Sequence, residues 1–395
     1  MKIRCIIFSL ILFMGCSKQE TIEIPEHMKH LDNLTVYNTD VEPAMTINLE
    51  REISFGETED VIIGRMGDIS ISESGRVFIS DMSQNTIHVF DPEGSYVTKI
   101  GNRGRGPGEF NHITAMRIDS NRLYTYDSNL NRINIFSLES LDLYRTVSLN
   151  PENWNHIEEL SRMYTRPKDF HIRNDSTMLI SFTHGFTENE YYVPYYLMNI
   201  EGEIISDKVF EHKGYTYFST ARSAGYMQYA YFSFMPVSLI TVSDGDRIYL
   251  AWSEDFLVKI YDPKGGYERA FYYPHKNVKL DQEKEFEDYN DVLMRMIQGE
   301  ELPENWPAMN SMQFDDVNRL WISTIVEDSS VYDWWVLDDQ GNLLAKFTWP
   351  RDKGSDWPGD QAIEEVKNGY LYARETEEDT GLVEIVRYRI EMEDI

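Results

Sequence analysis

The stretch GRVFISD at residues 75–81 is echoed by NRLYTYD at residues 121–127, 46 positions further along the chain. Each copy has a turn residue and an arginine before a short alternating or apolar run, a pattern typical of a tight turn that enters a β-strand. Clear copies begin at Asp246 and Asn318, and looser copies begin at Asp175 and Asn368. Self-similarity at such an interval indicates a repeat architecture.

Most repeats carry a second element, in which a turn of Asp, Gly and Pro separates two further strands. VFDPEGSYVTKI at 89–100 and IYDPKGGYERAF at 260–271 are two examples, and their turn chemistry predicts hairpins. Each unit therefore offers four strands. We count six units, at roughly 66–100, 112–147, 169–210, 236–271, 310–347 and 361–391.

The sixth unit is one strand short. Its third strand, at 382–390, runs almost to the last residue, and no partner strand follows it. The run AMTINL at 44–49 can supply the missing strand and close the ring between the two ends of the chain. The sequence thus predicts an all-β, six-bladed β-propeller with four-stranded blades and an N-terminal strand completing the last blade. One inserted helix is expected at 281–298, where apolar residues recur at near-helical spacing.

The glycine-rich stretch IGNRGRGPGEF at 100–110 could cradle a phosphate or turn a corner. A phosphate-binding loop needs a helix after it, with the helix N-terminus facing the phosphate. No helical pattern follows this stretch. It lies between the outermost strand of one unit and the innermost strand of the next, so we interpret it as a crossover between blades, where glycine permits turns with positive φ.

The N-terminus has the pattern of an export signal. A basic MKIR precedes ten apolar residues at 5–14, a segment too short to span a bilayer comfortably. Gly15-Cys16-Ser17 follows and resembles the bacterial lipoprotein signal, which predicts cleavage before Cys16 and lipidation of that cysteine. The alternatives are an ordinary secretory signal or a buried anchor helix. We expect a signal peptide at 1–15, a lipidated Cys16 with a flexible tether at 16–34, and the propeller at 35–395.

A family resemblance follows from the crossover residues. GRGPGEF at 104–110, with Ile118-Asp119 after it, looks like the blade signature of the NHL-repeat proteins. With the lipoprotein signal and six blades, the chain resembles the six-bladed β-propeller lipoproteins of Bacteroidetes, of the NHL-repeat and TolB-like type. The resemblance covers about 35–395 and implies a fold and a place in the cell envelope, as an outer-membrane lipoprotein. It implies no particular reaction.

Composition limits the partners. The chain has 67 acidic and 37 basic residues, a formal charge of −30, and such a field repels nucleic acid. After the expected cleavage the folded part holds no free thiol, so neither a disulfide nor a cysteine nucleophile is expected. The expected partners are the membrane, through the lipid, and a protein, glycan or peptide ligand. We expect a monomeric propeller.

Long insertions at 148–168, 184–194, 211–235 and 273–309 fall on the face that carries the crossovers, and loops grouped on one side of a rigid scaffold often carry function. Two of them are rich in aromatic residues, which either bind a ligand or pack the loops onto the rim. The aromatic candidates for ligand binding are Tyr191, Tyr192, Tyr215 and Tyr217.

Basic residues and histidines supply the other candidates. Arginines in the crossovers could bind an anionic ligand or could pair with the many acidic residues. Histidines near the channel mouth could bind zinc, as in six-bladed lyases, but their spacing forms no metal-binding motif. These candidates are Arg103, Arg105, His112, Arg166, His184 and Arg222. The repeated Arg76, Arg122, Arg247 and Arg319 are expected to serve the fold.

The favoured reading is a lipid-anchored, noncatalytic binding protein that uses the aromatic-rich loop face. One alternative is a metal-dependent lyase or lactonase at the mouth of the central channel, which would place a divalent metal there. Another is a structural accessory of an outer-membrane complex. No cofactor is predicted, no catalytic residue is singled out, and the sequence leaves open which side of the membrane the propeller faces.

Overall fold

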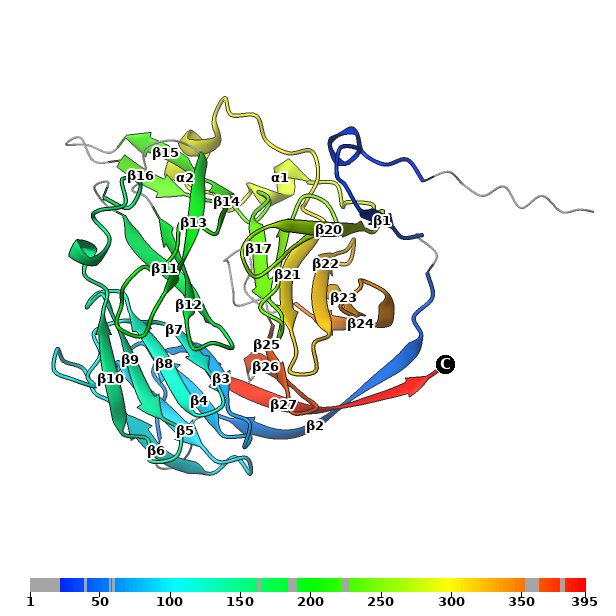
Figure 1. Cartoon of the computed structure of the whole chain (residues 1–395). Coiled ribbons are helices and arrows are strands. Elements are labelled where there is room, and N and C mark those ends of the chain that lie inside the picture. Colours follow the sequence, from blue (N-terminus) through cyan, green and yellow to red (C-terminus); the bar gives the residue numbers. More distant parts are fainter. Residues whose placement is uncertain are drawn as a thin grey trace, which may run out of the picture.

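Six sheets of four antiparallel strands surround a central opening in the computed structural model of the protein (Figure 1), so the predicted six-bladed β-propeller is confirmed. The structure describes residues 22–38, 41–56, 58, 61–161, 165–183, 190–221, 227–351, 362–376 and 381–395. In blades 1 to 5 the strand nearest the channel comes first along the chain, and the following strands lead toward the rim.

The first three blades follow one another along the chain. Blade 1 consists of β3 (Met66–Ile71), β4 (Val77–Asp81), β5 (Thr86–Phe90) and β6 (Tyr96–Ile100). Blade 2 consists of β7 (Ile113–Ile118), β8 (Arg122–Asp127), β9 (Arg132–Ser137) and β10 (Leu143–Ser148). Blade 3 consists of β11 (Arg166–Ile172), β12 (Met178–Thr183), β13 (Glu190–Met198) and β14 (Phe210–Thr216).

The other three blades complete the circle. Blade 4 consists of β17 (Ser238–Val242), β18 (Ile248–Trp252), β19 (Leu257–Tyr261) and β20 (Tyr267–Tyr272). Blade 5 consists of β21 (Met309–Phe314), β22 (Leu320–Ile325), β23 (Val331–Leu337) and β24 (Leu343–Pro350). Blade 6 consists of β25 (Ile363–Lys367), β26 (Tyr370–Thr376), β27 (Val383–Asp394) and β2 (Met45–Phe55).

Blade 6 shows that the ring closes as the sequence predicts. The N-terminal β2 is its outermost strand and pairs antiparallel with the C-terminal β27 in ten residue pairs, from Met45–Asp394 to Phe55–Ile385. Figure 1 shows the two strands side by side along the lower edge of the molecule. Phe55 is fully buried against rings of blades 1 and 6, Phe90 and Tyr372. The two ends of the chain are therefore held by main-chain hydrogen bonds and by a shared core.

The hydrophobic core is divided among the gaps between neighbouring blades. Each of the six gaps holds its own cluster of buried residues. Between blades 1 and 6, for example, Ile71 and Val77 pack with Ile385. Because apolar strand faces must pair to be removed from water, each blade is stabilised by both of its neighbours.

The aspartate that ends the repeated GRVFISD and NRLYTYD stretches explains their likeness. Asp81 and Asp127 are fully buried at the ends of β4 and β8. Asp81 accepts hydrogen bonds from Ser83 N in the next turn, at 2.7 Å, and from Gly64 N in the preceding crossover, at 3.0 Å. Asp127 likewise accepts from Asn111 N at 2.6 Å. A buried carboxylate therefore ties each middle turn to the chain entering that blade.

The glycine-rich stretch is a crossover, as predicted from the sequence. It leads from β6 to β7, and its polar groups are bonded within the protein. Glu109 accepts a hydrogen bond from Gly106 N at 2.6 Å, and Arg132 donates to the carbonyl oxygens of Gly106 and Glu109, each at 2.7 Å. The loop is thus held by its own side chains and by blade 2.

Part of the expected tether is folded onto blade 4. The 3₁₀-helix η1 (Glu26–Met28) buries Met28 against Leu257 and Tyr272, and β1 (Leu34–Val36) pairs parallel with β20. Blade 4 consequently has a fifth strand on its outer edge. The flexible tether expected at 16–34 is therefore too long, because residues 22–36 pack against the rim. Residues 1–21, which include Cys16, lie outside the described part of the chain.

The helical segment expected at 281–298 is present, but it is divided. It consists of two short helices, α1 (Gln282–Glu285) and α2 (Asp291–Ile297). The first helix ends at Glu285, and Asn290 caps the second, because its side chain accepts hydrogen bonds from Val292 N and Leu293 N at 2.9 and 3.1 Å. A second 3₁₀-helix, η2 (Pro151–Asn153), lies in the crossover from blade 2 to blade 3.

An additional hairpin stands on the face that carries the crossovers. Its strands are β15 (Phe218–Ala221) and β16 (Met227–Ala230). Phe218 packs with Leu280 and Met296 of the α1–α2 insertion, and Figure 1 shows the hairpin beside α2 along the upper edge. None of the described helices is long and apolar enough to cross a bilayer.

Removal of β2 is expected to abolish cooperative folding, because blade 6 would then expose the edge of β27 and lose the buried Phe55. We expect a chain starting at residue 56 to show no single unfolding transition in thermal circular dichroism. A chain starting at residue 41 is the matched control, because it lacks β1 but keeps β2, and it should unfold cooperatively. A cooperative transition in the chain starting at residue 56 would contradict closure by β2.

Candidate functional site

The six innermost strands enclose a cavity of about 1300 Å³. Residues of β3, β7, β11, β17, β21 and β25 line it, so every blade contributes one wall. The lining includes nine ionisable side chains that carry charge in their usual state at neutral pH. These are Arg65, Asp68, Arg117, Lys168, Asp169, Glu364, Glu365, Lys367 and Arg374.

Bulges in the innermost strands explain how these strands place so many charges on one side. A regular strand alternates its side chains between two faces. The register of β11 shifts between Pro167 and Phe170, and that of β25 shifts between Ile363 and Glu365. Consecutive residues of each strand, Lys168-Asp169 and Glu364-Glu365, consequently line the same cavity.

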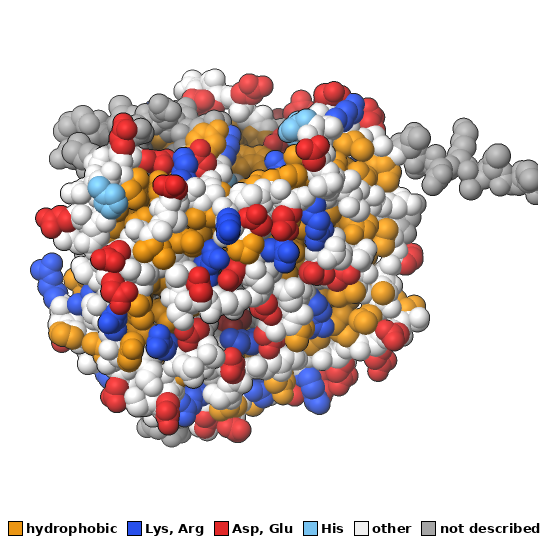
Figure 2. Space-filling model, viewed as in Figure 1, with side chains coloured by type: hydrophobic (Ala, Val, Ile, Leu, Met, Phe, Trp, Pro, Cys, Tyr) orange, Lys and Arg blue, Asp and Glu red, His pale blue; other side chains and the backbone are white. Residues whose placement is uncertain are grey.

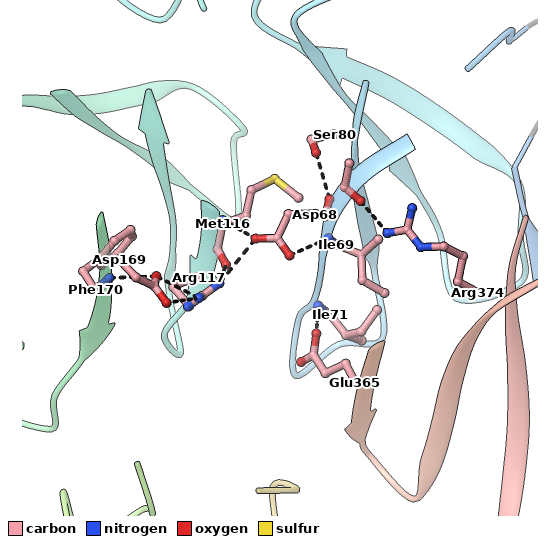
Figure 3. A network of polar contacts seen from close by, with 11 residues as sticks. Asp68, Ile69, Ile71, Ser80, Met116, Arg117, Asp169, Phe170, Glu365 and Arg374 are labelled. Carbon is pink, nitrogen blue, oxygen red and sulfur yellow. Dashed lines mark hydrogen bonds and ion pairs between the residues drawn. The ribbon is translucent and has the colours of Figure 1, made fainter. Parts of the chain in front are cut away.

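An ion network joins three blades across the channel wall (Figure 3). Arg117 Nη2 of β7 lies 2.9 and 3.1 Å from the two carboxylate oxygens of Asp169 on β11. Arg117 Nη1 lies 3.3 Å from Asp68 Oδ2 on β3, and Met116 N donates to the same oxygen at 2.6 Å. Blades 1, 2 and 3 are thus connected at the channel by charge-assisted hydrogen bonds.

The pKa values of the two aspartates of this network are shifted in opposite directions. Burial raises the pKa of Asp68, and it outweighs the opposing effect of Arg117. Burial would also raise the pKa of Asp169, but Arg117 and His171 overcome it, so that the pKa of Asp169 is lowered. The bidentate contact with Arg117 therefore keeps Asp169 ionised.

A second polar group joins blade 6 to blade 1, where the ring closes. Glu365 Oε2 accepts a hydrogen bond from Ile71 N at 2.9 Å, and Lys367 Nζ donates to Ile71 O at 2.8 Å. Arg374 donates to Gly67 O at 2.7 Å (Figure 3). Burial raises the pKa of Glu365 to about 7, although Lys367 opposes the shift. Glu365 is therefore partly protonated at neutral pH.

Two polar groups of β11 lack such partners. Among the described residues, no carboxylate lies within ion-pairing distance of Lys168 Nζ, which lies 5.6 Å from the centre of the Tyr215 ring. His171 Nε2 is buried and has no hydrogen-bond partner in the described part of the chain. The enclosing protein lowers the pKa of both side chains, so His171 is neutral at pH 7.

The structure separates the residues that the sequence singled out. Arg103, Arg105 and His112 lie in the crossover from blade 1 to blade 2, and Arg166 is exposed at the start of β11. None of these four side chains lines the cavity. His184 and Arg222 lie outside the described residues. The histidines and arginines therefore remain predictions that no contact in the described structure brings together.

The tyrosines are divided between packing and exposure. Tyr217 is buried, with its ring 5.5 Å from that of Tyr229, and Tyr215 packs at 5.2 Å from Tyr231. Tyr192 is 52% exposed. The side chain of Tyr191 is outside the described set. Of these tyrosines, Tyr215 contacts a channel residue, Lys168, which places the aromatic loops next to the channel mouth.

The repeated arginines serve the fold, as expected. Arg247 forms an ion pair with Glu268 at 2.8 Å, and Arg76 donates to Leu138 O in the next blade at 3.0 Å. No group of three or more His, Cys, Asp or Glu side chains that could hold a metal occurs among the described residues. The described histidines therefore form no zinc site with other such side chains of the described residues, and His184 lies outside that part of the chain.

The sequence contained a signal for the channel residues. Four of the six innermost strands read MGDISI, ITAMRI, RPKDFHI and IEEVK, and each of them carries at least one charged residue. The gaps between blades are apolar, so a charged side chain on an innermost strand is expected to face the channel. To use this signal, one must know which strand of each unit is innermost and where the bulges lie. The repeat pattern identifies the innermost strand but does not locate the bulges.

Comparison with known proteins agrees with the fold. The profile of the DUF5128 family, described as 6-bladed beta-propeller, matches residues 47–221. No curated protein sequence matches the chain. The chain belongs to the six-bladed β-propellers.

Several solved structures are similar to the chain. An exported protein of Bacteroides fragilis is 11% identical, with a TM-score of 0.51 over 91% of this chain and 99% of its own. A member of the DUF4221 family from Bacteroides vulgatus is 11% identical, with a TM-score of 0.50 over 89% and 99%. A streptogramin B lyase is 10% identical, with a TM-score of 0.43 over 89% and 100%. These likenesses concern the fold.

Replacement of Glu365 by glutamine is expected to stabilise the protein above neutral pH. Because the pKa of Glu365 is raised from 4.5 to about 7, the folded state binds this proton more tightly than the unfolded state. The free energy of unfolding of the wild-type protein therefore falls as the pH rises through this range, and the variant avoids that loss. We expect a difference of about 1–3 kcal/mol above pH 7 and none below pH 4.

Urea unfolding followed by tryptophan fluorescence measures this difference. Replacement of the exposed Glu73 by glutamine is the matched control and should not alter the pH dependence. The account of Glu365 fails if E365Q and the wild-type protein keep a constant difference in unfolding free energy between pH 4 and pH 8.

Proposed function

We propose that this protein is an exported, lipid-anchored binding protein whose central channel takes up a small polar ligand from the face that carries the crossovers. One observation carries the proposal: a cavity of about 1300 Å³, large enough for a small molecule, is lined by charged and polar side chains from all six blades. The walls are fixed by the ion networks of Arg117 and Arg374, so the site is formed before a ligand arrives.

The hairpin and the aromatic loops support entry from the crossover face. Tyr215 and Lys168 are in contact, and Lys168 lies near the start of β11, the end of that strand that receives the crossover. The aromatic face predicted from the sequence becomes, in this proposal, the surroundings of the channel mouth. Its buried rings pack the hairpin in place, and Tyr192, which is 52% exposed, presents its ring to the surroundings.

The location of the protein rests on its N-terminus. The pattern around Cys16 supports lipidation, and the structurally similar protein of Bacteroides fragilis is described as exported. With residues 22–36 packed on blade 4, a short segment would connect the lipid to the rim. The propeller would then be held close to the membrane surface, in the cell envelope.

The lyase or lactonase alternative has weaker support. Both classes considered from the sequence depend on a divalent metal, and the described residues bring together no group of three metal-binding side chains. The acidic side chains of the channel are instead engaged with arginine, lysine and main-chain amides. The role as an accessory of a membrane complex is favoured by no contact in the described structure.

Filling the channel is expected to abolish ligand binding without unfolding the protein. Thr114 of β7 lines the cavity and is exposed to it, so a tryptophan there would occupy the space that a ligand needs. We expect at least one compound from a panel of sugars, amino acids, short peptides and organic acids to raise the melting temperature of the wild-type protein. That shift should be lost in T114W, because only binding to the folded state stabilises it.

The matched control places the same side chain on the rim. Val97 on the outermost strand of blade 1 is 47% exposed, and V97W should respond to the compound as the wild-type protein does. A compound whose effect persists in T114W binds outside the channel and argues against the proposal. A melting-temperature change with chelator, reversed by one metal ion, would favour the enzyme alternative.

A further inference from the structure

The charges that line the channel do not balance. Five basic and four acidic side chains face the cavity, giving it a formal charge of +1, whereas the whole chain carries −30. The negative charge is further reduced at neutral pH, because burial raises the pKa of Glu365 to about 7. The channel lining is therefore one anionic group short of neutrality, although the chain as a whole is strongly acidic.

Most basic groups of the channel already have partners. Arg117 is bonded to two aspartates, Arg374 forms an ion pair with Glu364 at 2.5 Å, and Lys367 lies 3.8 Å from Glu365. Arg65 is exposed, where an unpaired charge costs little. Lys168 is exposed as well, but it lines the cavity from an innermost strand beside the ring of Tyr215, and no carboxylate of the described residues lies within ion-pairing distance of it.

A second unsatisfied group lies on the same strand. His171 Nε2 is buried without a hydrogen-bond partner in the described structure, and it belongs to a residue that lines the cavity. A buried polar atom without a partner costs free energy, commonly about 1–3 kcal/mol. As neutral imidazole, Nε2 can donate one hydrogen bond when it carries the proton. The bulge in β11 allows Lys168 and His171 to face the same space.

We propose that Lys168 and His171 bind a carboxylate group of the channel ligand, which makes the protein a receptor for a small organic acid. This inference rests on the proposed function in the channel and deepens it. Lys168 supplies the positive charge and His171 a hydrogen bond, while Tyr215 covers the lysine from the side of the mouth.

The surroundings favour a monoanion over a phosphate. Asp169 is the neighbour of Lys168 and is kept ionised by Arg117, so a dianion would be repelled more strongly than a carboxylate. The Arg117 guanidinium is also occupied by two carboxylates and is not free to form the bidentate contact typical of phosphate sites. One carboxylate added to the lining brings its formal charge to zero.

Chemical modification of Lys168 tests the proposal directly. Reductive methylation of the protein starting at residue 22, which retains every described residue, would be followed at each lysine by mass spectrometry. The probes are glucuronate, N-acetylglycine and succinate, each compared with its amide, and inorganic phosphate. We expect at least one carboxylate at millimolar concentration to slow methylation of Lys168 severalfold and its amide to have no effect. Lys346, on the rim against Trp335, is the internal control.

Variants then separate charge recognition from stability. In calorimetry with the protecting carboxylate, K168M should lose about tenfold or more in affinity, K168R should retain most of it, and K346M should match the wild-type protein. Protection of Lys168 by none of the carboxylates, equal protection by the amides, or protection by phosphate alone would overturn the carboxylate site. Neutral compounds that bind in a T114W-sensitive manner, with no dependence on Lys168, would overturn this inference while leaving the proposed function standing.

Discussion

The pairing of β2 with β27 is the constraint on which the rest of the molecule depends. A propeller with an open ring has two unprotected edges and an unsealed core between its first and last blades. Here one blade is built from both ends of the chain, and the seam beside it is sealed at the channel by Glu365, Lys367 and Arg374. The cavity exists only when this seam is closed. Formation of the candidate site therefore depends on closure of the ring.

Much of the fold could be predicted from the sequence, because local sequence patterns specify the turns and strands of each repeat. The turn residues before each strand and the spacing of the repeats gave six units, and a missing strand in the last unit predicted its replacement from the N-terminus. The features that the sequence did not predict depend on packing between distant segments. Asn290 caps a new helix where one continuous helix was expected, and Met28 folds part of the expected tether onto blade 4. Such contacts link distant segments, and no local pattern encodes them.

The candidate site was harder to foresee than the fold. From the sequence, arginines in the crossovers, such as Arg103 and Arg105, are predicted to bind a ligand, because loops on one face often do so. In the structure Arg103 and Arg105 do not line the cavity, whereas Arg117, Lys168 and Asp169 of the innermost strands do. Which face of a strand a charge occupies depends on a one-residue bulge. The sequence does not reveal a bulge, so the placement of Lys168 beside Asp169 required the structure.

The distribution of charge gives the molecule two environments. Figure 2 shows acidic and basic side chains interspersed over the visible surface, and the chain as a whole carries a formal charge of −30. Inside the channel the balance is reversed, with Lys168 left unpaired among the described residues. A site of this kind favours a small anion that can enter a channel over a large one that meets the outer surface.

Hydrogen–deuterium exchange with and without a compound that raises the melting temperature would test the central claim, that ligands bind in the channel, most directly. The account predicts slower exchange in peptides that contain the innermost strands β7, β11 and β25, with little change in the outermost strands β6 and β10. Protection confined to the β15–β16 hairpin or to the rim, with the innermost strands unchanged, would contradict it.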